Sequence, residues 1–367
     1  MTILRPDAEP KDSQSLATSP SPQPSPEGRG GDWLALDIGG ANLKAADGRG
    51  WAVWRPFALW QRHDGLPDAL ADLLRGSPPA DALAVTMTGE LADCFSTKAE
   101  GVAAILAAVA AAACARAIWV YRVDGSWAKP KEALRRPLLT AASNWHALAR
   151  FAGRYAPQGT ALAIDIGSTT CDLIPLRDGQ PAAQGRTDPQ RLVRGELVYT
   201  GVQRSPIAAV ARRLPWRGRL CPTAQELFAT TWDVYLLLGD LPEEAECTHT
   251  ADGRPATRRF AHERLARAIC ADREMVDLDA AIAMARAAAD AQLSQLAAAA
   301  KKVLRGMSQP PGRAVISGSG EFLARRLLAR LGLDVPIISL REELGPALSR
   351  AATAHALAVL ARESCHG

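Results

Sequence analysis

The chain has 367 residues, of which 48% are hydrophobic and 22% are charged, and its formal net charge is +4. This composition is typical of a water-soluble globular protein, and the length predicts two domains. The small, dispersed charge favours neither a nucleic acid nor a membrane surface as a partner. The seven cysteines include no C-x-x-C pair and the N-terminus lacks an apolar signal core, so we expect reduced thiols in a cytoplasmic protein.

The first half of the chain predicts a tail followed by one lobe. Residues 1–31 are rich in Pro, Ser and Gly and predict a disordered tail. Residues 32–158 predict a lobe that opens with a hairpin at 34–47. Its further elements are expected, in chain order, as a strand at Trp51–Phe57, a helix at Leu66–Arg75, a strand at Ala82–Met87, an alanine-rich buried helix at Val102–Ala115, a strand at Ala117–Val123 and a helix at Ser143–Tyr155 capped by Ser143 or Asn144.

The second half predicts a similar lobe over residues 159–345, followed by a C-terminal segment, 346–367, that packs back on the first lobe. The expected elements are a hairpin at 162–176, a Gly- and Pro-punctuated segment at 186–220, a helical middle at 224–300, a strand at Arg313–Ser317, a helix at Phe322–Leu331 and a last helix at Leu344–Glu363. Strands mixed with helices, and a repeated opening hairpin, indicate an α/β fold of two similar lobes.

The two hairpins carry one short pattern twice, LALDIGGANLKAAD from Leu34 and LAIDIGSTTCDLIPL from Leu162. In each copy an apolar strand ends in Asp, Asp37 or Asp165, and an Ile-Gly turn follows. An Asp at the end of an apolar strand is costly unless it is paired or binds a metal ion, and the turn amides suit phosphate oxygens. The repeat therefore predicts phosphate or metal binding. The expected phosphate-binding residues are Gly39, Gly40, Asn42, Gly167, Ser168, Thr169 and Thr170.

Lys44 and Asp172 occupy equivalent positions in the two copies. Lys44 can neutralise a phosphate, whereas Asp172 can hold a metal-bound water or accept a proton. The alternative for both is a solvent-facing charge on a strand. Glu90, in the stretch TMTGELAD just after a strand, is a second candidate to accept a proton, with a helix N-terminal acid as its alternative.

A third loop joins a strand to a helix through Gly318, Ser319, Gly320 and Glu321, where free helix amides can bind an anion or a polar ligand. Glycine at such a turn is also common for packing alone. Two further substrate-binding candidates are weaker. Asn144 can line the site, and Arg194 can pair with a substrate carboxylate, although an ordinary surface arginine explains it equally well.

These motifs carry a family resemblance. Two Asp-Ile-Gly hairpins followed by a late strand-GSGE-helix resemble the two phosphate motifs and the adenosine motif of the actin/sugar-kinase/Hsp70 superfamily. Within it, the chain resembles the hydantoinase/oxoprolinase branch. It is most similar to the tetrahydromethanopterin-linked C1-transfer pathway proteins related to the archaeal (aminomethyl)furan synthases of methanofuran biosynthesis. The resembling stretches include TMTGELADCFSTKAEGV, SNWHALARF, RGELVYTGVQRSPIAAVA, FATTWDVYLLLGDLPE and ADGRPATRR.

The resemblance implies two lobes of the actin/hexokinase/Hsp70 (ribonuclease H-like) type with an interlobe cleft. It implies a transferase that joins a furanylmethyl diphosphate to the phenol of a tyramine- or tyrosine-type acceptor and releases diphosphate. By position, Asp37 and Asp165 would bind Mg²⁺, while Asp172 or Glu90 would take the phenol proton. Two alternatives stay open: an ATP-dependent kinase or hydantoinase/oxoprolinase-like hydrolase, and a non-catalytic assembly protein with a nucleotide switch.

Overall fold

The computed structural model describes residues 32–364. The expected disordered tail at 1–31 and Cys365 lie outside these residues. The other six cysteines are free thiols, and Cys171 is fully buried. None of the helices in 32–364 combines the length and the apolar character needed to cross a lipid bilayer.

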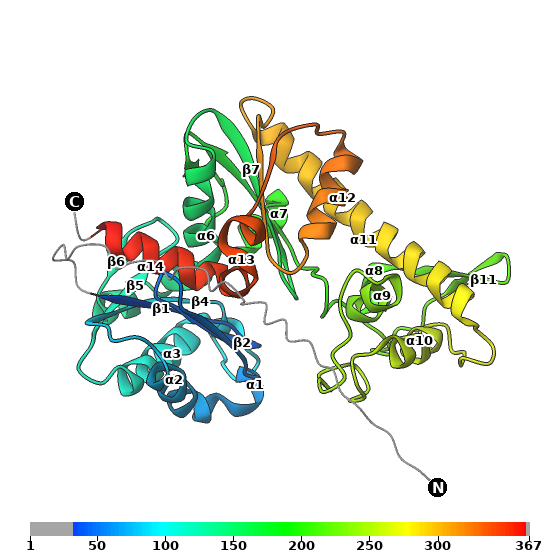
Figure 1. Cartoon of the computed structure of the whole chain (residues 1–367), viewed down its shortest axis with the longest axis horizontal. Coiled ribbons are helices and arrows are strands. Elements are labelled where there is room, and N and C mark those ends of the chain that lie inside the picture. Colours follow the sequence, from blue (N-terminus) through cyan, green and yellow to red (C-terminus); the bar gives the residue numbers. More distant parts are fainter. Residues whose placement is uncertain (1–31, 365–367) are drawn as a thin grey trace, which may run out of the picture. The chain divides into compact units, whose positions relative to one another are not determined.

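The first lobe is built on a six-stranded sheet with the strand order β3-β2-β1-β4-β5-β6 (Figure 1). The strands are β1 (Trp33–Ile38), β2 (Asn42–Ala46), β3 (Ala52–Pro56), β4 (Ala82–Met87), β5 (Ala117–Tyr121) and β6 (Trp127–Ala128). The first three strands pair antiparallel, whereas β4 lies parallel to β1 and β5 lies parallel to β4. β1 and β4 are buried along their whole length, as continuous apolar runs predict for strands covered on both faces.

Helices cover both faces of this sheet. Leu34 and Leu36 of β1 share a hydrophobic core with α2 (Leu66–Arg75) and α3 (Lys98–Ala112), whereas Trp33 and Ala35 pack against α14 (Ala352–Ser364). Successive side chains of a strand point to opposite faces, so Asp37 shares its face with Trp33 and Ala35. The remaining helices of this part are α1 (Leu59–Arg62), α4 (Pro130–Arg135), α5 (Pro137–Thr140) and α6 (Asn144–Ala152).

The second lobe is built on a sheet with the order β10-β8-β7-β13-β14, to which β9 adds by pairing with β8. The strands are β7 (Thr160–Ile166), β8 (Cys171–Arg177), β9 (Gln180–Pro181), β10 (Leu197–Val198), β13 (Ala314–Ser317) and β14 (Ile337–Ser339). As in the first lobe, an antiparallel hairpin, β7–β8, opens the sheet and a later strand, β13, lies parallel to its first strand. This repetition confirms the expected α/β fold of two similar lobes.

The helices between residues 207 and 331 share a core with the second sheet, and β11 (Arg213–Trp216) and β12 (Arg219–Pro222) form a separate ribbon. The helices are α7 (Asp188–Arg194), α8 (Ile207–Val210), α9 (Thr231–Leu238), α10 (Arg258–Arg267), α11 (Leu278–Gly306), α12 (Glu321–Leu331) and α13 (Leu340–Arg350). Figure 1 shows α11 as the long helix of this part, with α9 and α10 beside it.

Two helix predictions were wrong in extent. The helical middle at 224–300 is interrupted, because Gly239 adopts a left-handed conformation that ends α9, and α10 begins only at Arg258. The last helix is two helices, because Ala351 leaves the helical conformation between α13 and α14, and α13 is itself kinked where Gly345, with φ +78, precedes Pro346.

Gly101 of α3 packs closely against the backbone of Glu90. A Cβ at residue 101 would lie 2.3 Å from the carbonyl oxygen of Glu90. Gly101→Ala is therefore expected to destabilise the protein by roughly 1–3 kcal/mol, despite the higher helix propensity of alanine, because backbone must move. Chemical denaturation measures the change. Gly76→Ala is the matched control, since nothing lies within 4 Å of its Cβ; equal midpoints for both variants would contradict this packing.

Candidate functional site

The two repeated hairpins place their polar residues in equivalent positions. β1 pairs with β2 so that Asp37 lies opposite Lys44, and β7 pairs with β8 so that Asp165 lies opposite Asp172. Each turn is closed in the same way, by an amide of the first glycine: Gly39 N donates to Asn42 O and Gly167 N donates to Thr170 O, both at 2.9 Å. The register thus places a carboxylate and an ammonium beside the first turn and two carboxylates beside the second.

Both turns leave backbone amides without protein partners. Across residues 32–364, no hydrogen bond takes the amide N–H of Gly40, Ala41, Ser168 or Thr169 as its donor. The hydroxyls of Ser168 and Thr169 lie 3.3 Å apart beside the second turn. Successive free amides in a turn form an anion-binding concavity, so each turn can receive phosphate oxygens.

Lys44 pairs with Asp37 of its own hairpin and is also attracted by the charge of Asp165 in the second hairpin. Its Nζ lies 3.2 Å from Oδ2 of Asp37. The residue Asp37 is only 3% exposed. Burial lowers the pKa of Lys44, but the attraction of Asp37 and then of Asp165 outweighs it, and the net pKa is raised. Lys44 therefore remains an ammonium, and the structure brings it together with Asp37 and Asp165.

Asp165 is held in a poorly solvated position. Burial raises its pKa, repulsion from Asp172 raises it further, and the hydroxyl of Ser317 and the Lys44 ammonium only partly offset this, leaving the pKa at about 6. The Ser317 hydroxyl donates to Oδ1 of Asp165. A carboxyl that is costly to ionise in the free protein is well suited to a cationic or hydrogen-donating ligand.

Asp172 is already engaged by a buried arginine. Nη2 of Arg191 lies 2.5 Å from Oδ1 of Asp172, and the Arg191 guanidinium stacks over the ring of Trp145 at 4.2 Å. Burial raises the pKa of Asp172 and Arg191 opposes this, with a net rise. Nothing in the stretch around Arg191 distinguishes it from the many other arginines of the sequence, so sequence reasoning missed this partner.

Glu90 lies in a short 3-10 helix, Gly89–Leu91, directly after β4 and next to the first turn, where Thr88 N donates to Ile38 O at 2.9 Å. Its side chain is 1% exposed, and within the described chain its Oε2 has no hydrogen-bond partner. Burial raises the pKa of Glu90, and the ammonium of Lys98, 3.5 Å from Oε1, lowers it, giving about 7. A carboxyl that is half ionised near neutral pH suits general-base chemistry.

The alternative for Glu90, an acid at a helix start, concerns the 3-10 helix Gly89–Leu91, whose first turn contains Glu90, and not the following helix α3. α3 is capped by Thr97, whose hydroxyl accepts from Glu100 N at 3.1 Å, and the Glu100 carboxylate accepts from Ser96 N at 2.9 Å. Glu90 precedes this cap and takes no part in it.

The third loop packs directly against the second hairpin. Gly318 has φ +88, and a Cβ there would lie 2.2 Å from Ile166 O, so only glycine fits. Gly320 N donates to Ile166 O at 2.9 Å, and Ser319 is exposed. Glu321, expected to bind substrate, instead accepts from the Ser339 hydroxyl and from Arg341 N, which ties α12 to β14 and α13.

Asn144 is half-buried at the first residue of α6. The preceding residue, Ser143, does not cap the helix as expected, because its hydroxyl donates to Tyr121 O at 3.0 Å. Ser143 also lies 2.7 Å from the hydroxyl of Thr86, the β4 residue opposite Asp37. These contacts fix the start of α6 near the first hairpin.

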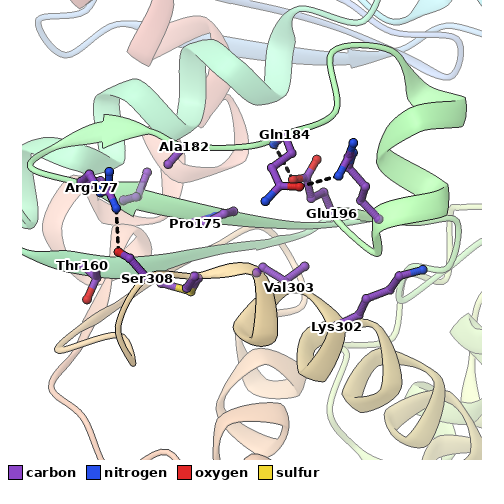
Figure 2. Close-up of a pocket in the computed structure, with 13 residues that line it drawn as sticks. Thr160, Pro175, Arg177, Ala182, Gln184, Glu196, Lys302, Val303 and Ser308 are labelled. Atoms are coloured by element: carbon purple, nitrogen blue, oxygen red, sulfur yellow. Dashed lines mark hydrogen bonds between the residues drawn. The ribbon is translucent and has the colours of Figure 1, made fainter.

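Arg194 lies in a different part of the second lobe. It lines a cavity of about 380 Å³ and hydrogen-bonds to Gln184. Figure 2 shows this cavity with Arg177 and Ser308 at one end and Lys302 at the other. Thr160 and Arg177, which also line it, pair at the end of the hairpin opposite its turn. The structure therefore does not bring Arg194 to the two turns.

The first and second turns are also linked by a side-chain contact. The guanidinium of Arg204 lies 4.9 Å from the ring centroid of Trp60. Arg204 N donates to Ser168 O of the second turn at 3.0 Å, while Leu59, beside Trp60, donates its N–H to Gly40 O of the first turn at 2.9 Å. No sequence motif marked Trp60.

Asp37 has one carboxylate oxygen to which a cation, such as the expected magnesium ion, could bind. Residues 32–364 contain no group of three or more His, Cys, Asp and Glu side chains that could hold a metal ion. However, Oδ1 of Asp37 is buried without a hydrogen-bond partner. Mg²⁺ commonly uses one or two protein carboxylates and completes its shell with phosphate oxygens and water. Asp37 and Asp165 match that donor set.

The hydantoinase/oxoprolinase family model matches residues 81–361 of the chain. A relative from Methanocaldococcus jannaschii, named (4-{4-[2-(gamma-L-glutamylamino)ethyl]phenoxymethyl}furan-2-yl)methanamine synthase, is 34% identical over 330 residues, which cover 89% of this chain and 96% of the relative. A relative with the same name from Methanococcus vannielii is 30% identical over 203 residues, covering 54% of this chain and 89% of the relative.

Solved structures are similar only at low identity. An inorganic polyphosphate/ATP-glucomannokinase from Arthrobacter sp. strain KM matches at 16% identity and a TM-score of 0.43, covering 90% of this chain and 99% of that chain. The archaeal actin homolog Ta0583 matches at 12% identity and a TM-score of 0.44, covering 91% of this chain and 99% of that chain. Similarity at this level carries no argument about activity.

The raised pKa of Asp165 predicts a pH-dependent stability cost. The pKa of Asp165 is about 6 in the folded protein, against an ordinary value of 3.8. Its protonation therefore stabilises the folded state below about pH 3.8, and this stabilisation is lost as the pH rises through 6. Asp165→Asn removes the titration, so its stability relative to wild type should be about 3 kcal/mol higher at pH 8 than at pH 3.5. Denaturation at both pH values measures this. The exposed Asp334→Asn is the control; a pH-independent difference would refute the burial argument.

Proposed function

The chain belongs to the hydantoinase/oxoprolinase family, and from that membership and the twin-hairpin site we propose that it is a synthase that forms an aryl ether on a furanylmethyl group. The name of its Methanocaldococcus jannaschii relative describes a phenoxymethyl-furan product with a gamma-glutamylaminoethyl substituent. The donor proposed for this chain is a furanylmethyl diphosphate, and the acceptor is a tyramine- or tyrosine-type phenol. The product would serve methanofuran-like cofactor biosynthesis.

The convergence of Asp37, Lys44 and Asp165 beside two turns with free amides is the observation that carries this proposal. A diphosphate has two phosphoryl groups, and two related turns offer one amide cluster for each. Lys44 adds a positive charge between them. These groups stabilise the negative charge that develops on the leaving diphosphate. Because this charge grows in the transition state, the interaction accelerates bond cleavage.

The proposed reaction breaks the C–O bond between the furanylmethyl carbon and diphosphate, and the bonding electron pair leaves with diphosphate. The phenol oxygen then bonds to the exposed CH₂ carbon and loses its proton. The furan ring stabilises positive charge on that carbon, so the protein mainly has to hold the leaving group. Asp37 and Asp165 would hold Mg²⁺, which neutralises diphosphate charge when bound.

Glu90 is the proposed acceptor of the phenol proton. Among residues 32–364 its Oε2 has no hydrogen-bond partner, whereas Asp172 already receives the short hydrogen bond from Arg191. The pKa of Glu90, about 7, leaves a large ionised fraction at neutral pH. Asp172 then acts as a positioning residue that keeps Arg191 and the second hairpin in register.

The test is release of diphosphate by the purified full-length protein. We expect release with an aminomethylfuranmethyl diphosphate, a phenolic acceptor and Mg²⁺, without ATP. Tyramine, tyrosine and gamma-glutamyltyramine are compared as acceptors. No release with any of these phenols would overturn the proposal, and turnover that requires ATP would instead assign a kinase- or hydrolase-type activity.

Replacement of Glu90 tests the proton acceptor. Glu90→Gln keeps the shape of the side chain but cannot accept the proton, so kcat should fall roughly 10²- to 10⁴-fold with little change in the acceptor KM. Steady-state kinetics measure this. Glu100→Gln, on the adjacent helix cap, is the control and should retain most activity. If Asp172→Asn loses activity and Glu90→Gln does not, the two roles are reversed.

A further inference from the structure

Lys98 joins Glu90 to the second lobe. It is the first residue of α3, which packs on the first sheet, and its Nζ lies 3.5 Å from Oε1 of Glu90. The same Nζ lies 2.6 Å from Oδ2 of Asp188, the first residue of α7 in the second lobe. One ammonium is thus shared between carboxylates of two lobes, and the shorter contact is to Asp188.

This group differs from an ordinary surface ion pair. The Glu90 side chain is 1% exposed, and those of Lys98 and Asp188 are 20% and 18% exposed. Exposed ion pairs contribute little because water and salt screen them, whereas charges removed from water interact more strongly. A change at Asp188 should therefore be felt at Glu90.

The charges continue from Asp188 to the second hairpin. Oδ1 of Asp188 lies 3.9 Å from Nη1 of Arg191, and Arg191 holds Asp172 at 2.5 Å. Asp172 in turn lies opposite Asp165 in the hairpin. Alternating charges therefore connect the proposed proton acceptor in one lobe to the diphosphate-binding hairpin of the other.

We propose that Lys98 and Asp188 are positioning residues for Glu90: Asp188 takes the shorter contact with the Lys98 ammonium, which leaves only a longer contact to Oε1 of Glu90 and keeps Oε2 available for the acceptor proton. This inference rests on the role proposed above for Glu90. It adds that the proton acceptor is completed by a residue of the second lobe, and it functions only while the two lobes meet at this contact.

The two positioning residues should act on Glu90 in opposite directions. The charged groups that face Glu90 are Lys98 from α3 and Asp188 from α7. After burial, which raises the Glu90 pKa most, Lys98 lowers it and Asp188 raises it. Removing Lys98 therefore makes the carboxylate harder to form. Removing the Asp188 charge makes it easier to form, and also frees Lys98 to pair fully with Glu90.

The experiment compares the pH profiles of kcat/KM for Lys98→Met and Asp188→Asn in the full-length protein. Activity requires ionised Glu90, so the ascending limb reports its protonation. We expect the limb to move up by roughly one pH unit in Lys98→Met and down by roughly one unit in Asp188→Asn. Lys98→Arg, which keeps the charge, should restore the limb toward wild type. Exposed Lys301→Met and Asp334→Asn are the controls and should not shift it.

Shifts in the same direction, or lower activity with no shift, would overturn the inference and leave only a structural contact. If Lys98→Met fails to fold, the Asp188→Asn variant still tests the inference, because an ascending limb that does not move to lower pH would contradict it. A readout independent of turnover is infrared difference titration of the Glu90 carboxyl, with Glu90→Gln as the subtracted reference. If the wild type releases no diphosphate, the proposed function fails, while this titration still tests the opposite effects of Lys98 and Asp188.

Discussion

The Lys44 ammonium lies within the electrostatic reach of Asp37 from the first hairpin and Asp165 from the second, and the rest of the site depends on this attraction. Buried carboxylates of like charge repel each other, and a shared cation offsets that repulsion. Both sheets present these groups at the ends of central strands, which are held by antiparallel neighbours on one side and parallel neighbours on the other. The scaffold therefore fixes the charges more firmly than flexible loops would.

The attraction of nearby cations does not fully offset the burial and mutual repulsion of these carboxylates. Asp165 and Glu90 both have pKa values well above the ordinary range, and Asp37 and Glu90 each keep one buried oxygen without a partner in the described chain. Unpaired polar atoms cost stability in a folded protein, so they are expected mainly where a ligand completes them. The two unpartnered oxygens lie on either side of the first turn, one before it in β1 and one in the 3-10 helix packed beside it.

The sequence was sufficient to predict the parts of the site that are local. Each Asp-Ile-Gly hairpin encodes its own strands, turn and carboxylate, so the α/β fold and the positions of Asp37 and Asp165 followed from the repeat. Partners from distant elements were not predictable: Arg191 and Asp188 resemble any other arginine and aspartate in the chain, and only folding brings them to Asp172 and Lys98. Glu321 was assigned to the ligand because a helix start suggests one, but its carboxylate is used to anchor α13.

The C-terminal helix α14 carries a consequence for biogenesis. It covers the face of the first sheet that bears Trp33 and Ala35, through residues such as Leu357 and Leu360. Since β1 precedes α14 by most of the described chain, this face of the first sheet stays uncovered during synthesis until α14 has been made. Ala352 and Ala356 of α14 also share a core cluster with Ala163 and Ile174 of the second sheet, so part of the second lobe depends on the same helix. The first sheet is therefore completed by a helix that is made after the strands of the second lobe, and its apolar face is prone to aggregation until then.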